Sequence, residues 1–112
     1  MKLPRDTIIA DAKLTKYLLA SRDADDKSKF LAQAGYTQFN WQQLQADLRS
    51  QILRLDAIPG DEPNSFGDTY IIRGNLTRPN NMELAVVTVW MIEYETQKAK
   101  FITLYPDKEA QA

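Results

Sequence analysis

The sequence predicts an α+β domain in which two to three N-terminal helices pack on one face of a three- to four-stranded antiparallel C-terminal sheet. Three observations carry this prediction. Apolar residues recur at helical spacing as far as about residue 56, and they alternate with polar residues after the Pro- and Gly-containing loop at 59–64. The connections between the strand-like runs are short enough for hairpins. We expect a single domain over 1–112, with the helical part at about 10–56, the sheet at about 66–106 and a polar tail at 107–112.

In the helical part, the first helix is expected over about 12–20, with Asp11 as its N-cap. A second short helix is expected to end at Gly35, in the position that glycine favours after a helix. A third is expected to begin after Asn40. The apolar residues that form the stripes of these helices are Leu14, Tyr17, Leu18, Phe30, Leu31, Ala34, Trp41, Leu44, Leu48 and Ile52.

The strands begin with a short one predicted somewhere in 53–58. Three longer runs follow at about 68–76, 83–94 and 100–105, and sequential hairpins would join them into an antiparallel meander. The tail after Pro106 is polar and is expected to be frayed.

Strand alternation sorts the side chains of the sheet into two faces. We expect the helices to cover the purely apolar face, which comprises Ile72, Leu76, Val87, Val89, Met91, Ile102 and Leu104. The other face would then be free and mixed, with Ile71, Arg73, Thr88, Trp90, Ile92, Phe101, Thr103 and Tyr105.

The free face is the best candidate for a functional surface. Arg73 could clamp a phosphate, Trp90 and Tyr105 could stack on a base, and the hydroxyls of Thr88 and Thr103 could orient an oxygen. The same residue types are also the ones that strands favour without any ligand. The residues alone therefore leave three alternatives open: an ordinary sheet face, an oligomer or partner interface, and a ligand or catalytic site.

Composition narrows the possible chemistry. The 112 residues include no cysteine and no histidine, which excludes disulfides, Cys-His and Ser-His nucleophile pairs and most transition-metal sites. We expect no metal site and no cofactor. The net charge of −1 counts against a large phosphate-tracking surface, although a small basic site is compatible with it. No stretch approaches the roughly 18 apolar residues that span a bilayer, so we expect a cytoplasmic protein that does not enter a membrane.

Lys27 and Lys29 stand at the start of the second predicted helix, after an acidic stretch at 23–26. Contact with nucleic acid is one interpretation of this pair, and an ordinary solvated helix start is the other. The acidic stretch lacks the spacing, the glycine and the distal glutamate of an EF-hand, so capping and solubility explain it better than calcium.

Several segments, taken in order, resemble a known family. The segment Lys13-Leu14-Thr15-Lys16-Tyr17-Leu18-Leu19 resembles its "KL-x-x-YLL" helix. Lys27-Ser28-Lys29-Phe30-Leu31, leading to Gly35-Tyr36, resembles its lysine helix. Phe66-Gly67-Asp68-Thr69-Tyr70, Thr88-Val89-Trp90 and Thr103-Leu104-Tyr105-Pro106 resemble its "Y-G-x-x-Y", "T-V-W" and "T-A-Y-P" segments. From about Leu3 to Pro106 the chain thus resembles the bacterial domain-of-unknown-function 6883 family.

The layout of that family is in turn similar to the metal-independent ribonuclease toxins of the barnase, colicin and RelE types. This resemblance implies a ribonuclease-like domain of a toxin–antitoxin or polymorphic toxin system that acts on RNA at the open sheet face. The site residues it implies, together with Arg73 from the face assignment, are Lys29, Arg73, Thr88, Thr103 and Tyr105 as catalytic residues and Lys27 and Trp90 as substrate-binding residues.

The chain departs from many relatives just before the lysine helix, where they carry a His-Pro-x-Gly segment and this chain has no histidine at 21–26. An activity that depended on that histidine would be absent here. The expected partners are RNA, a cognate antitoxin or immunity protein, or a second copy of the chain. The alternative to an enzyme is a non-catalytic interaction or oligomerisation module that uses the open sheet face.

Overall fold

The computed structural model describes residues 1–20, 27–61, 64–77 and 83–109. Short helices come first and strands follow, which confirms the predicted α+β class. The helical segments are η1 (Lys13–Leu18), α1 (Ser28–Ala32), η2 (Gln38–Asn40), α2 (Trp41–Asp47) and η3 (Leu48–Ile52). The strands are β1 (Ile58–Pro59), β2 (Gly67–Leu76), β3 (Leu84–Glu93) and β4 (Ala99–Pro106).

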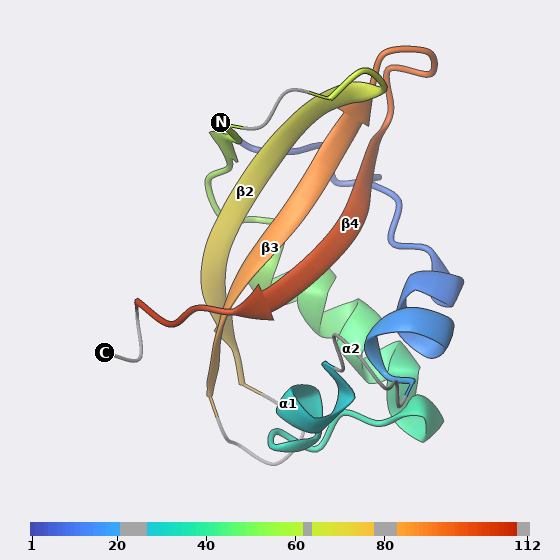
Figure 1. Ribbon diagram of the computed structural model, residues 1–112, viewed down its shortest axis with the longest axis vertical. Helices are drawn as coiled ribbons and strands as arrows, with labels where there is room; N and C mark the ends of the chain where they lie inside the picture. Colours follow the sequence, from blue (N-terminus) through green and yellow to red (C-terminus); the bar gives the residue numbers. More distant parts are fainter. Residues whose placement is uncertain (21–26, 62–63, 78–82, 110–112) are drawn as a thin grey trace.

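The strands form one four-stranded antiparallel sheet in the order β1-β2-β3-β4, as expected for a meander. The helices lie together on one side of this twisted sheet (Figure 1). Their apolar stripes and the facing side chains of β2, β3 and β4 form one buried cluster. The opposite side of the sheet carries no helix among the described residues.

Local signals explain where the helices begin and end. Gly35 has a positive φ of 91°, and the following Tyr36 N–H donates to the Leu31 carbonyl, so glycine ends the turn that follows α1 as predicted. The Asp11 carboxylate does not cap η1; it accepts from Gln45 Nε2 at 2.9 Å. Asn40 precedes α2, but its side chain serves a capping box with Thr37 around η2.

The extended N-terminal segment is bound to both layers. Ile8 forms a parallel bridge with Lys100 on the edge of β4. Its carbonyl accepts from Phe101 N–H at 2.8 Å. Arg49, on η3, donates to the carbonyls of Arg5 and Thr7 at 2.7 and 2.9 Å. These bonds satisfy backbone groups that would otherwise lack partners and hold the N-terminal segment against the fold.

The core-facing side of β3 is opposite to the one expected. Thr88 and Trp90 are fully buried beneath the helices, whereas Val87, Val89 and Met91 face the other side. The expected placement of Thr88 and Trp90 on the free face is therefore wrong. Apolar residues occupy both sides of this strand, so alternation alone did not distinguish them.

The hydrogen bonding of Thr88 explains how a polar side chain is accommodated in the core. Its hydroxyl donates to the Ile72 carbonyl at 2.8 Å and accepts from the Trp90 indole N–H at 2.7 Å. The Trp90 ring packs edge-on against Phe101, with centroids 5.1 Å apart. The Thr88 hydroxyl and the Trp90 indole N–H thus both have hydrogen-bond partners.

An irregularity in β4 explains why Phe101 is also buried, although it was expected on the free face. Val89 pairs with Thr103, but Trp90 pairs with Phe101, so Ile102 is an extra residue in β4. Such a bulge resets the alternation along a strand. Phe101 consequently faces the core, while Thr103 and Tyr105 remain on the open face.

The start of the C-terminal tail differs from the expected frayed segment. The Asp107 N–H donates to the Ala85 carbonyl at 2.9 Å, and the residue is only 7% exposed. Asp107 therefore continues the sheet contact beyond β4.

The predicted connections at 21–26 and 78–81 include positions outside the described residues. Within the described ranges, no helix is both long and apolar enough to cross a membrane.

The Thr88 hydrogen bonds predict a specific stability effect. Thr88→Val should lower the free energy of unfolding by about 1–3 kcal/mol, because the Trp90 N–H and the Ile72 carbonyl would each lose a buried partner. Thr69→Val is the matched control, since Thr69 lies half-buried on the opposite face of β2. It should change stability by less than about 0.5 kcal/mol. Urea denaturation measures both, and equal effects would contradict this role of Thr88.

Candidate ligand cavity on the open sheet face

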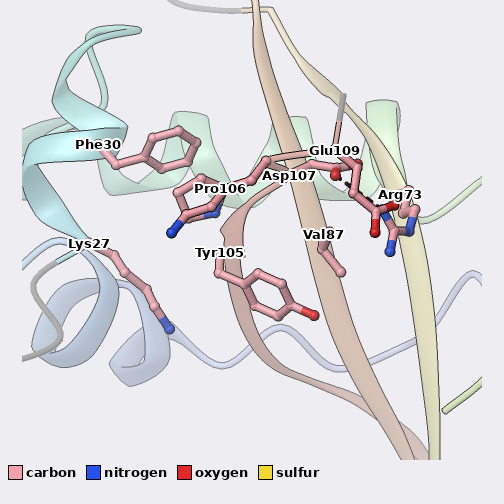
Figure 2. Close-up of a pocket in the computed structure, with 9 residues that line it drawn as sticks. Lys27, Phe30, Arg73, Val87, Tyr105, Pro106, Asp107 and Glu109 are labelled. Carbon is pink, nitrogen blue, oxygen red and sulfur yellow. Dashed lines mark hydrogen bonds and ion pairs between the residues drawn. The ribbon is translucent and has the colours of Figure 1, made fainter. Parts of the chain in front are cut away.

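A cavity of about 630 Å³ opens where β2, β3 and β4 meet the C-terminal tail, and the start of α1 borders it on one side (Figure 2). We call it the Tyr105 cavity. Its lining consists of Lys27, Phe30, Arg73, Val87, Tyr105, Pro106, Asp107, Lys108 and Glu109.

Strand register builds the floor of this cavity. Arg73 on β2 pairs with Val87 on β3, and Val87 pairs with Tyr105 on β4. Directly paired residues point to the same face of a sheet, so these three side chains form a row across the open face. Val87 is buried in the middle of the row, with a cationic side chain on one side and a phenol on the other.

The tail supplies two carboxylates to Arg73. Arg73 Nη1 lies 3.0 Å from Asp107 Oδ1 and 3.3 Å from Glu109 Oε2. The Asp107 side chain is 9% exposed, whereas the Glu109 side chain is 85% exposed. The buried carboxylate thus orients the guanidinium, and the exposed one remains in contact with solvent.

Lys27 enters the cavity from the start of α1. Its ammonium donates to the Thr103 hydroxyl at 3.0 Å. It also lies 5.4 Å from the centre of the Tyr17 ring, within the range of a cation–π contact. These contacts anchor the helix terminus to β4 and place a second cation near Tyr105, whose side chain is partly exposed.

The structure thus brings together some of the predicted site residues. Lys27, Arg73 and Tyr105 line the cavity, and Thr103 contacts Lys27. Lys29 is exposed and does not line it. Thr88 and Trp90 lie in the core instead. Their burial prevents direct contact with a ligand on the open face.

Residues of the tail were missed by the sequence reasoning. Asp107, Lys108 and Glu109 line the cavity, although the tail was expected to be frayed. The available signal was that Asp107 follows directly after the last strand, where a side chain still lies within reach of the neighbouring strands. The pairing of β2, β3 and β4 is needed to show that Arg73 lies close enough to be the partner of Asp107.

A different cavity, of about 420 Å³, lies near the start of β2 and the end of β3 and includes Asp68 and Tyr94 in its lining. Hydrogen bonding to Asp68 raises the pKa of Tyr94, with the bond from the phenol 2.8 Å long. No group of three acidic, histidine or cysteine side chains that could hold a metal occurs in the described part of the chain.

The sequence of the chain matches the profile of a family over residues 2–108. Its description is "Domain of unknown function (DUF6883)". The chain belongs to this family. The match covers the helical layer, the sheet and the first part of the tail, including Asp107 and Lys108 of the Tyr105 cavity. No curated protein and no solved structure matches the chain significantly.

The two tail carboxylates predict unequal contributions to stability. Asp107→Asn should destabilise the DUF6883 domain by about 0.5–1 kcal/mol, a value kept low because Arg73 is half-exposed. Glu109→Gln should have no measurable effect, because that carboxylate is largely solvated. Chemical denaturation of both variants, alone and combined with Arg73→Gln, measures the coupling. An equal loss for the two single variants would contradict a specific role for Asp107.

Proposed function

We propose that this domain binds RNA at the Tyr105 cavity and cleaves it without a metal ion, as a ribonuclease-like domain. The observation that supports this proposal is the convergence of cationic side chains, a phenol and an exposed carboxylate on one open cavity. Separate elements contribute them: Lys27 stands at α1, Arg73 on β2, Tyr105 on β4 and Glu109 in the tail.

The cations serve the phosphate. Arg73 is 47% exposed in its side chain, and Asp107 holds its orientation. A guanidinium presents several N–H groups in one plane, so it can bind a phosphate while it retains a carboxylate partner. Lys27 adds a second positive charge. Together they would stabilise the extra negative charge that develops on the non-bridging phosphate oxygens during attack.

The exposed carboxylate of Glu109 is the proposed proton acceptor. In the proposed step the RNA 2′-oxygen attacks the adjacent phosphorus, and Glu109 accepts the 2′-hydroxyl proton. The bond from phosphorus to the 5′-oxygen breaks, and that oxygen takes its proton from the Tyr105 phenol or from water. The products are a 2′,3′-cyclic phosphate and a free 5′-hydroxyl. No histidine is needed in this assignment.

The aromatic and apolar side chains of the cavity would contact a nucleobase of the RNA. Tyr105 is 41% exposed and lines the cavity together with Phe30, Val87 and Pro106. Stacking on an aromatic side chain is the usual way that single-stranded RNA is held without regard to sequence. We therefore expect single strands to be preferred over duplexes.

Cleavage of a labelled single-stranded RNA in the presence of EDTA tests this function. The wild-type chain should release a 2′,3′-cyclic phosphate product. Lys27→Gln should slow the reaction by about 100-fold, a typical loss when one group that stabilises transition-state charge is removed. Glu109→Gln should also slow it, with a changed pH profile, because the proposed base is lost.

Lys29→Gln is the matched control, because Lys29 is a lysine of the same helix that does not line the cavity. Its rate should stay within about twofold of the wild type. A larger loss for Lys29→Gln than for Lys27→Gln would show that another surface acts on the substrate. A folded wild-type protein that neither binds nor cleaves RNA would refute the proposal.

A second candidate function is an interaction module that uses the apolar part of the open face. Ile58 pairs with Ile71, Ile71 with Val89, and Val89 with Thr103, so these side chains form a row across all four strands. Ile58 is 55% exposed, and the other three are half-buried. Covering apolar surface of this kind with a partner lowers the free energy of the complex. A second copy of the chain, an antitoxin or an immunity protein would each fit this proposal.

Light scattering tests the self-association form of this second function. A dimer of the wild type should dissociate in Ile58→Lys, because burying an unpaired ammonium in the contact is unfavourable. Phe39→Lys is the matched control, since Phe39 is 99% exposed on η2, outside the sheet. It should leave the dimer intact. A wild type that stays monomeric at the highest concentrations would rule out the homodimer.

A further inference from the structure

A second cavity, of about 610 Å³, lies between the N-terminal segment and η3. We call it the Arg49 cavity. Its lining includes Lys2, Leu3, Arg5, Arg49, Leu53 and Arg54. It shares no lining residue with the Tyr105 cavity, so the inference below does not rest on the proposed ribonuclease function.

The charge of this cavity is one-sided. Four of its lining side chains are cationic, and none is acidic. Among the described residues, Arg5, Arg49 and Arg54 make no ion pair. Lys2 lies 3.5 Å from Asp56, but both side chains are mostly exposed, so water weakens that pair.

Hydrogen bonds within the fold use only some of the N–H groups of these cations. Arg49 donates to the carbonyls of Arg5 and Thr7, and this contact fixes the N-terminal segment. Arg54 uses Nε to bind the Ser50 carbonyl. The two terminal nitrogens of Arg54 and the whole guanidinium of Arg5 make no hydrogen bond within the described residues. These groups remain available to a ligand.

The shape favours a compact ligand. The cations surround one cavity of a size typical for small-molecule sites, instead of following a track along the surface as a nucleic-acid strand would require. Leu3 and Leu53 are nearly buried and give the cavity an apolar component. Several guanidinium groups around one space fit a dense negative charge, and the planar guanidinium matches the geometry of phosphate oxygens.

We propose that the Arg49 cavity is a binding site for a small anionic ligand that carries two or more linked phosphate groups. Arg5 and Arg54 contact the phosphates. Arg49 and Lys2 contribute charge from groups that also bind the backbone, since the Lys2 ammonium donates to the Arg54 carbonyl at 2.8 Å. The same chemistry is offered by free inorganic polyphosphate and by the polyphosphate arm of a nucleotide.

Isothermal titration of the full chain with inorganic triphosphate tests this site. The wild type should bind, and raised salt should weaken the binding because the contact is electrostatic. The variant Arg5→Gln with Arg54→Gln should bind at least about tenfold more weakly, equivalent to about 1.4 kcal/mol. Lys16→Gln with Lys98→Gln removes the same charge from exposed positions outside both cavities and should change affinity by less than about twofold.

Two further arms complete the experiment. ATP that binds more tightly than triphosphate, with the same sensitivity to the arginine substitutions, would identify the nucleotide as the source of the phosphates. Equal affinity would identify the phosphate arm alone, and both results support the site. If the double variant does not fold, Arg5→Gln alone keeps the test valid, because the Arg5 side chain makes no hydrogen bond in the described part of the chain.

The contrary outcomes are equally specific. The proposal is overturned if triphosphate does not bind, or if the two double variants weaken binding equally. Loss of triphosphate binding in Lys27→Gln, with no loss in the arginine variant, would move the ligand to the Tyr105 cavity. A short oligoribonucleotide that depends on Arg5 and Arg54 and binds more tightly than triphosphate would replace the compact ligand with a nucleic-acid strand.

Discussion

The hydrogen bonds of one buried hydroxyl group determine much of this structure. Thr88 joins the backbone of β2 to the indole of Trp90 inside the core, with bonds of 2.8 and 2.7 Å. Because these bonds satisfy both polar groups, the central strand β3 can direct its largest side chain toward the helices. The neighbouring positions of β3 must then face the other way, since side chains alternate along a strand.

The candidate ligand cavity is a consequence of that orientation. With Trp90 inside, Val87 lies on the open face, and antiparallel register places Arg73 and Tyr105 on either side of it. The bulge in β4 has a matching effect, because it lets Phe101 join Trp90 in the core while Thr103 and Tyr105 stay outside. The same strand register therefore produces both the open cavity and the aromatic core.

Local signals in the sequence were sufficient for the fold class and much of the element order. Gly35 marked the end of a helix, and the change of periodicity near residue 60 separated helices from strands. The open-face positions of Arg73 and Tyr105 were also predictable, because each alternates with buried leucine or isoleucine. The sides of β3 were not predictable in this way. Both sides of the strand are apolar, and the hydrogen bond from Thr88 to the Ile72 carbonyl joins residues 16 positions apart in the chain.

The net charge of the chain does not predict how charge is distributed over its surface. The value of −1 argued against a large site for phosphate, yet the cations of the chain are not evenly mixed with its carboxylates. Arg73 is held by two carboxylates within 3.3 Å, whereas Arg5, Arg49 and Arg54 surround a cavity without an acidic lining residue. Electrostatic attraction depends on such local separation, because salt screens charges beyond about 10 Å. Two cavities of one weakly acidic domain can therefore present different fields to a ligand, one in which carboxylates offset part of the positive charge and one without such carboxylates.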